Sequence, residues 1–287
     1  MTEQDFPALY RSADKLSLDS QKYFFRALFI HLSLLVAAAV LSMPIFSGKW
    51  VAIAQLLALT ATLGCSIYLA TVRPDRYWYA GRAVAESVKT ITWRYVSRAE
   101  PFNTKDEIAR SDFQQSLSMI FNQNRDVGSK LIDYSNEGQF TEIMEQMRKS
   151  SLDIRKENYN EKRIKEQRNW YAKKANFNKK MGDCFFWGLV IINFIAIILA
   201  VLKISCIDSK YLPVDLVITL AASLLSWIQA KRFTELSASY ALTAHEIGFI
   251  NEQSALITTE SKFSKFVGDA ENAFSREHTQ WAARRDV

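Results

Sequence analysis

Four long stretches without a charged residue constrain this chain more than any other feature of its sequence. They cover residues 27–48, 50–72, 184–202 and 216–230. A helix needs about 20 mostly apolar residues to cross the hydrocarbon core of a bilayer. The first three stretches are long enough as they stand, and the fourth is long enough if its helix begins near Leu212 and carries Asp215 at its mouth. We therefore predict an all-α polytopic membrane protein with four transmembrane helices in two hairpins, at about 27–48, 50–72, 184–202 and 212–230.

The remainder of the sequence is polar, and this hides the spans from the average composition. The mean hydropathy of −0.08 is that of a soluble protein, because long charged segments cancel the four apolar stretches. The three cysteines have no metal-ligand spacing, the three histidines have no second ligand nearby, and the nine glycines form no phosphate-binding loop. We therefore do not expect an enzyme, and we expect no catalytic residue, no metal site and no cofactor.

The formal net charge of +6 is concentrated between the second and third spans. Residues 73–183 hold 22 Lys and Arg against 16 Asp and Glu, whereas residues 1–26 and 231–287 are nearly balanced. Cationic residues beside apolar spans set the topology and attract anionic lipid. The positive-inside rule then places both termini and residues 73–183 in the cytoplasm, with both hairpin loops outside. No nucleic-acid partner is expected.

An internal repeat relates the two hairpins. The spans of the second hairpin follow those of the first at a shift of about 160 residues. Each hairpin is followed by a segment with a helical pattern that carries a matching pair, Ala85-Glu86 after the first and His245-Glu246 after the second. Tandem duplication is the favoured interpretation. We predict a first module at 1–137 and a second at 138–287, each with long cytoplasmic helices.

Polar residues inside the second span of each hairpin fall on one helix face. The fourth span has them at i, i+4, i+8 and i+11 with a fifth beyond, and the second span has them at i, i+7 and i+11. Polar side chains at membrane depth face the bundle interior or a water-filled path. One chain supplies only two such helices, so that a channel implies a homo-oligomer. The pore-lining candidates are Gln55, Thr62, Ser66, Asp215, Thr219, Ser223, Ser226 and Gln229.

These polar rows also have a second interpretation, which stays open at this point. Ser and Thr form hydrogen bonds between helices in membranes, and small residues let helices approach closely. Such packing accounts for the hydroxyl residues of the fourth span without any pore. It accounts less well for Gln55 and Asp215, which lie at the outer ends of their spans. His31, an isolated polar residue of the first span, is expected to make one hydrogen bond between helices.

Aromatic and charged motifs outside the spans resemble a known family. After the second span come Tyr77-Trp78-Tyr79, Arg82, Glu86, Lys89, Trp93-Arg94-Tyr95 and Pro101. Before the third span come Tyr159, Arg163, Gln167, Trp170-Tyr171 and Lys174-Ala175, and near the C-terminus come Ala270-Glu271, Phe274-Ser275-Arg276-Glu277-His278 and Trp281. These motifs resemble those of SLATT-type domains, two-helix membrane modules found beside bacterial nucleotide-signalling and defence genes. Two such modules would cover nearly the whole chain.

The resemblance implies a bacterial inner-membrane effector that forms pores when a defence system is triggered. We find no nucleotide-sensing or nuclease domain in this sequence, so that the trigger would be an activator protein of the defence system, a small ligand such as a nucleotide signal bound in the cytoplasmic helices, or the membrane itself. The motif residues are candidates for a buried polar network that holds the cytoplasmic helices together, with ligand binding as their alternative role. They are Arg82, Glu86, Trp93, Arg163, Gln167, Trp170, Arg276, Glu277, His278 and Trp281.

The sequence thus predicts a multi-pass protein of the bacterial inner membrane, in contact with the lipid bilayer. Its oligomer would form a regulated ion-permeable pore that depolarises the membrane in antiviral defence. The alternative is a non-conducting membrane scaffold or sensor that recruits a cytoplasmic partner. The two differ in their mutants: substitutions in the polar rows change conductance in a pore and are silent in a scaffold, in which Trp281→Ala abolishes activity.

Overall fold

The computed structural model describes residues 1–205, 211–254 and 257–283, with side chains up to Phe274 in the last helix. Helices joined by loops make up this part of the chain, and no strand occurs in it. The α-helices are α1 (Ala8–Leu41), α2 (Lys49–Val72), α3 (Pro74–Val96), α4 (Asp106–Gln123), α5 (Arg125–Gly128), α6 (Glu142–Lys149), α7 (Leu152–Tyr159), α8 (Glu166–Ser205), α9 (Val214–Lys231), α10 (Phe233–Gln253) and α11 (Glu260–Ala283). A short 3₁₀ helix, η1 (Glu3–Asp5), precedes them, and a π-helix, η2 (Asn160–Lys165), joins α7 to α8. The all-α prediction is confirmed.

Four helical segments are long and apolar enough to cross a membrane, and they contain α1, α2, α8 and α9. The first predicted span is wrong at its end, because α1 stops at Leu41 and residues 42–48 form a turn that leads into α2. This turn holds Pro44, which cannot continue a helix, and Gly48, whose φ of 115° is accessible mainly to glycine. The end of α1 could not be predicted from the absence of charged residues, because the residues of the turn are uncharged as well.

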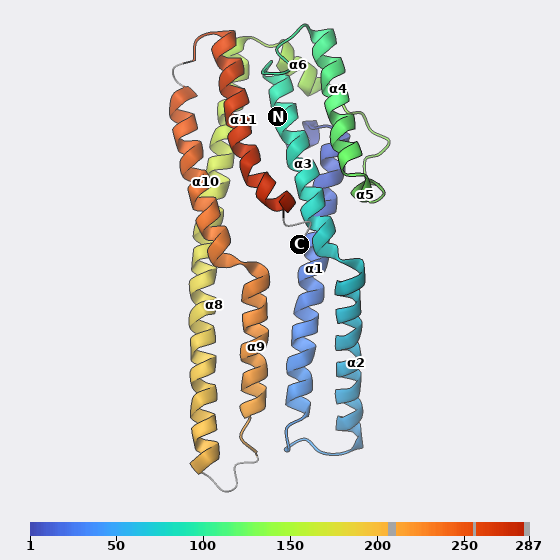
Figure 1. Ribbon diagram of the computed structural model, residues 1–287, viewed down its shortest axis with the longest axis vertical. Helices are drawn as coiled ribbons and strands as arrows, with labels where there is room; N and C mark the ends of the chain where they lie inside the picture. Colours follow the sequence, from blue (N-terminus) through green and yellow to red (C-terminus); the bar gives the residue numbers. More distant parts are fainter. Residues whose placement is uncertain (206–210, 255–256, 284–287) are drawn as a thin grey trace. The chain divides into compact units, whose positions relative to one another are not determined.

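The chain divides into two compact units. The membrane unit contains Lys22–Arg73 and Lys174–Ser239, and the polar unit contains Met1–Gln21, Pro74–Lys173 and Tyr240–Val287. In the membrane unit each hairpin is an antiparallel pair, α1 beside α2 and α8 beside α9 (Figure 1). Each unit is assembled from segments that are far apart in the sequence. The predicted module boundary after residue 137 stays a prediction.

Helix α3 is the centre of the polar unit. It packs against α11 most extensively and also contacts α4, α5 and α6. Its apolar residues Val84, Ala85 and Val88 are fully buried, as is Ala80. On the same side of the helix, Gly81 lies so close to α1 that an added Cβ would stand 3.0 Å from the Ala13 carbonyl oxygen. Small residues therefore set the spacing between α1 and α3.

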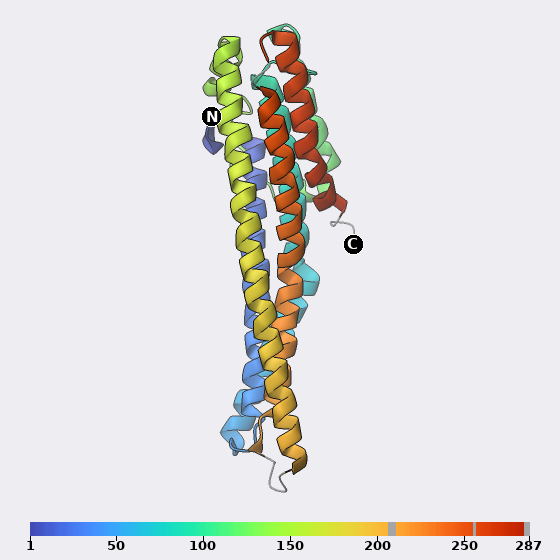
Figure 2. The ribbon, with the colours of Figure 1, turned by 90° about the vertical axis from the view of Figure 1, so that its left-hand side faces the viewer.

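The second half of the polar unit consists of a long helical run, made of α7, η2 and the start of α8, and of the pair α10 and α11. Helix α7, the π-helix η2 and α8 follow one another without a break in the chain. Helix α11 lies beside the C-terminal part of α10 (Figure 2). The π-helix buries Arg163 and Ile164. Such wide turns are rare, occur mostly as short segments inside α-helices and are frequently found at functional sites.

Candidate functional site

The polar row of α9 is open to its surroundings in the single chain. Asp215, Ser226 and Gln229 are exposed, and Thr219 and Ser223 are half-buried. The Thr219 hydroxyl donates to the Asp215 carbonyl oxygen at 2.8 Å, and the Ser226 hydroxyl donates to that of Ala222 at 2.9 Å. These two hydroxyls thus have their hydrogen-bond acceptors on their own helix. Asp215 lies in the first turn of α9, where the helix dipole favours a carboxylate.

The polar row of α2 faces α1 instead. Thr62 is buried, and its carbonyl oxygen lies 3.3 Å from Nδ1 of His31 on α1. The Ser66 hydroxyl lies 3.4 Å from the same nitrogen and donates to the Thr62 carbonyl oxygen at 3.1 Å. His31 therefore bonds between helices, as the sequence predicts. Gln55, the outermost member of this row, is half-buried. The α2 row contributes to packing within the first hairpin, whereas three of the five residues in the α9 row are exposed.

A first buried ion cluster joins α1 to α3 in the polar unit. Arg82 forms an ion pair with Glu86 at 2.6 Å and lies 3.8 Å from Asp14 of α1. The Glu86 side chain is only 2% exposed. Burial raises the pKa of the Asp14 carboxyl, and nearby Arg82 only partly counteracts this. Burial by itself lowers the pKa of Arg82, but Glu86 and Asp14 more than offset it and leave that pKa raised. The cluster therefore holds Arg82 firmly in its charged form.

A second buried ion cluster joins the π-helix to α11. Arg163 donates to both oxygens of Glu271, Nε to Oε1 at 2.9 Å and Nη2 to Oε2 at 2.7 Å. The Tyr159 hydroxyl donates to the same Oε1 at 3.0 Å, and burial raises the pKa of that phenol well above its ordinary value. The Arg163 guanidinium also stacks 4.7 Å from the Phe274 ring centroid. All four side chains are almost completely buried.

The two clusters act on each other electrostatically. Burial by itself lowers the pKa of Arg163, but Glu271 and, to a smaller extent, the Glu86 carboxylate raise it, and the net shift is upward. Burial lowers the pKa of the Lys89 amine, and Glu86 opposes this shift whereas Arg163 adds to it. Acidic and basic groups of α1, α3, η2 and α11 thus form one network inside the polar unit. Networks of this kind specify geometry and are costly when half broken.

The remaining network candidates have simpler surroundings. The Trp93 ring packs edge-on against Tyr159 at 5.7 Å and against Phe6 at 6.0 Å. Trp170 is partly exposed and meets the Tyr240 ring at 5.5 Å, while Gln167 is half-buried. Four further candidates lie beyond the side chains that the structure describes. These are Arg276, Glu277, His278 and Trp281.

Three members of the network, Asp14, Tyr159 and Glu271, were not among the predicted network residues, although Tyr159 and Glu271 stand in the family motifs. A signal for Glu271 was present, because Ala270-Glu271 repeats the Ala85-Glu86 pair and all four residues are buried. The pair that the repeat selected instead, His245-Glu246, has His245 exposed and Glu246 half-buried. The repeat shift thus points to α10, whereas the buried carboxylate of the second domain lies on α11.

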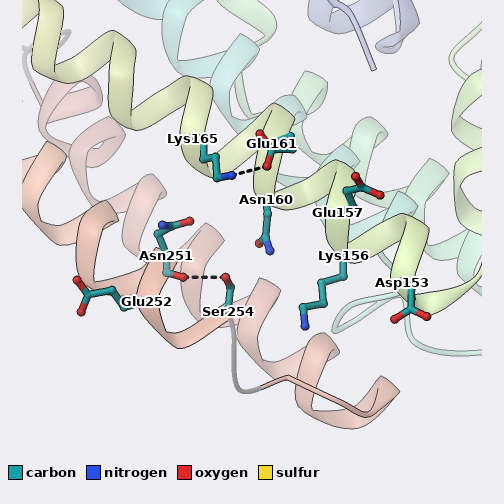
Figure 3. A pocket seen from close by; sticks show the side chains of 9 residues that line it. All are labelled: Asp153, Lys156, Glu157, Asn160, Glu161, Lys165, Asn251, Glu252 and Ser254. Atoms are coloured by element: carbon teal, nitrogen blue, oxygen red, sulfur yellow. Dashed lines mark hydrogen bonds and ion pairs between the residues drawn. The ribbon is translucent and has the colours of Figure 1, made fainter.

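A cavity of about 690 Å³ lies beside the π-helix, between α7, η2 and the end of α10. Lys156 and Asn160 point from the helical run towards Asn251 and Ser254 of the opposite wall (Figure 3). Acidic side chains outnumber basic ones on its walls, with four against two. Glu161 pairs with Lys165, and the Lys156 ammonium donates to the Ile257 carbonyl oxygen at 2.8 Å. This lining favours neutral or cationic molecules over anions.

Two family models match the chain one after the other. The SMODS and SLOG-associating 2TM effector domain 3 matches residues 7–156, and the SMODS and SLOG-associating 2TM effector domain 1 matches residues 159–281. The chain belongs to the SLATT family. It is a membrane effector protein with two tandem SLATT domains, as the motifs predicted. No curated protein and no solved structure matches the sequence. In this SLATT protein the ion pair of Arg82 and Glu86 lies in the first domain, and that of Arg163 and Glu271 in the second.

Proposed function

We propose that several copies of this SLATT protein assemble into a regulated ion-permeable pore that depolarises the bacterial inner membrane in antiviral defence. The observation that carries the proposal is the polar row of α9. Asp215, Ser226 and Gln229 are exposed on it in the single chain, within a segment apolar enough to span a membrane. Polar groups in that position face a water-filled path or another helix.

The packing of the spans supports assembly from several copies. At most 11% of the residues in any of the four apolar windows are buried inside the chain. The spans therefore keep most of their surface free for lipid or for further copies. Two helices with polar rows are too few to enclose a path, and of these two rows in one chain only that of α9 has exposed members. A homo-oligomer that brings several α9 helices together satisfies both observations.

The distribution of charge supports an orientation with both termini in the cytoplasm. The polar unit contains both ends of the described chain and three of the six excess positive charges of residues 73–183, and the other three stand next to the spans, at Arg73 and in residues 174–183. Lys and Arg next to spans are retained on the cytoplasmic side. The positions of the hairpin loops outside follow from this orientation.

For the trigger, the cavity beside the π-helix favours an activator protein over a nucleotide. Its walls carry more carboxylates than ammonium groups, and a nucleotide brings phosphate charges that these carboxylates repel. The activator would act on the polar unit, whose buried network joins four helical elements. The proposal includes no catalysis: the protein acts by opening a path.

The test is ion flux from liposomes that contain the purified protein, with and without the activator. Asp215→Ala and Ser223→Leu are expected to change conductance several-fold. Leu220→Ala is the matched control, since Leu220 is an exposed residue of α9 outside the polar row. Flux no greater than that of empty liposomes under every condition, activator included, contradicts the pore. A non-conducting scaffold would instead keep its activity in all three variants and lose it in Trp281→Ala.

A further inference from the structure

Lys231 joins the two hairpins at the end of α9. Its ammonium nitrogen lies 3.4 Å from the centroid of the Phe25 ring on α1 and 5.0 Å from that of Trp227 on its own helix. The two rings meet edge to face at 5.8 Å, and Phe29 adds a third ring 6.1 Å from Trp227. The ammonium is therefore held against aromatic faces, which attract cations through their quadrupole.

Aromatic rings hold this charge in place but do not neutralise it. Lys231 is half-buried, and it makes no ion pair with any side chain that the structure describes. Its neighbour Arg232 differs, because it pairs with Glu235 one turn later. A partly desolvated ammonium without a carboxylate is a costly arrangement unless an anion accompanies it.

The surroundings of Lys231 match the boundary of a membrane. It is the last residue of a span, and aromatic rings with a polar or charged neighbour are enriched at this depth. On α1, Lys22 stands three residues before Phe25 and Arg26 directly after it, and both are exposed. The anion that is abundant at this depth is the phosphate of an anionic phospholipid.

We propose that Lys231, supported by Phe25 and Trp227, binds the phosphate of an anionic phospholipid where α1 meets α9. The lipid headgroup completes the contact between the first and second hairpins. This site goes beyond the general attraction of basic residues to a negative membrane, because it depends on one ammonium and two rings. It does not depend on whether the protein conducts ions.

The test is a titration of the full-length protein in neutral detergent with dioctanoyl phosphatidylglycerol, read as bound lipid by native mass spectrometry. Dioctanoyl phosphatidylcholine gives the baseline for a zwitterionic lipid. Lys231→Gln keeps most of the packing volume and is expected to weaken phosphatidylglycerol binding about fivefold, the effect of one basic residue at a membrane surface. Lys231→Arg is expected to retain it. Lys179→Gln, at an exposed lysine that precedes the apolar part of α8, is the matched control and is expected to leave it unchanged.

Two further measurements decide the source of the phosphate and the role of the rings. Millimolar inorganic phosphate is expected not to displace the lipid, and Trp227→Leu is expected to weaken binding while every charge is kept. Equal affinities of Lys231→Gln and Lys179→Gln would overturn the proposal, as would displacement by inorganic phosphate. If Lys231→Gln does not fold, the comparison of Trp227→Leu with wild type decides in its place, and unchanged binding there overturns the site.

Discussion

Arg163 and Glu271 form a two-pronged ion pair in the interior of the polar unit, with side chains 1% and 0% exposed. The two residues are 108 positions apart in the chain and belong to the π-helix and α11. Tyr159 supplies a third donor to the same carboxylate. A carboxylate with this many donors fixes the position of α11 on the helical run. Its loss would leave a buried guanidinium without its counter-ion.

Glu271→Gln is therefore expected to lower the free energy of unfolding by about 3–5 kcal/mol, because removing one partner of a buried pair leaves the other charge uncompensated. The measurement is the thermal midpoint of the purified protein in detergent. Glu166→Gln is the control, since Glu166 pairs with Lys162 and the two side chains are 60% and 48% exposed, and it is expected to cost less than about 1 kcal/mol. Similar losses in the two variants would show that the buried pair contributes no more than a surface one.

Arg148 is expected not to tolerate lysine. Its side chain is 1% exposed and donates to the Tyr95 carbonyl oxygen at 2.7 Å, to Asp106 at 3.0 Å and to the Thr104 carbonyl oxygen at 3.2 Å. A single ammonium cannot reproduce the planar fork that serves three acceptors. Arg148→Lys should cost about 2–4 kcal/mol, since unmet buried groups cost about 1–3 kcal/mol each. Arg110→Lys, at an arginine that is 51% exposed, should stay within about 0.5 kcal/mol. Equal unfolding midpoints of the two variants would contradict the claim that the three hydrogen bonds of the Arg148 guanidinium stabilise the fold.

The close approach of α1 and α3 predicts opposite effects at two glycines. The Cβ of Gly81→Ala would stand 3.0 Å from two backbone atoms of α1, so that the helices must separate. We expect a loss of about 1–3 kcal/mol, as for overpacked cores. Gly268→Ala in α11 meets nothing within 4 Å and should gain up to about 1 kcal/mol from helix propensity. The same thermal unfolding assay compares them, and a stabilised Gly81→Ala would contradict the packing.

Asp14 is expected to make stability depend on pH. Burial raises the pKa of this carboxyl above its ordinary value of 3.8, so that the folded protein binds its proton more tightly than the unfolded chain does. Stability from this group therefore falls as pH rises from about 3.8 through the folded pKa, and stays at the lower level above it. Asp14→Asn removes this loss. As the pH is raised from 4 to 7, the unfolding midpoint of Asp14→Asn should therefore rise relative to that of the wild type. Asp126→Asn, which removes a negative charge at an exposed position, is the control for the change in net charge. A difference that does not change with pH would contradict the assignment.

The spans could be predicted from the sequence because hydrocarbon excludes charge, and a charge-free run is visible without any structure. The end of α1 was wrong by seven residues because Ser42, Pro44 and Gly48 are uncharged but end a helix. The π-helix could not be foreseen. Its six residues are almost all polar and give no apolar marks by which a wider turn could be told from an α-helical one.

The ion network was predictable only where it is local. Arg82 and Glu86 are four residues apart on one helix, and they do form an ion pair. Arg163 and Glu271 meet through the packing of α11 beside α3 and the helical run, which no spacing in the sequence encodes. The polar rows show the same limit. Periodicity found both of them, but only the structure shows that Thr62 and Ser66 contact His31 whereas Asp215 and Gln229 are exposed.

The central claim, that the α9 row lines an aqueous path, is tested most directly by water access to single cysteines. In a protein whose three native cysteines are replaced, Ser223→Cys on the row and Leu220→Cys outside it are reacted with a membrane-impermeant thiol reagent in conducting liposomes. The account predicts that Ser223→Cys reacts rapidly and that the reaction blocks ion flux, while Leu220→Cys stays unreactive and its flux unchanged. Equal reactivity of the two positions, or modification of Ser223→Cys that leaves flux intact, would contradict it.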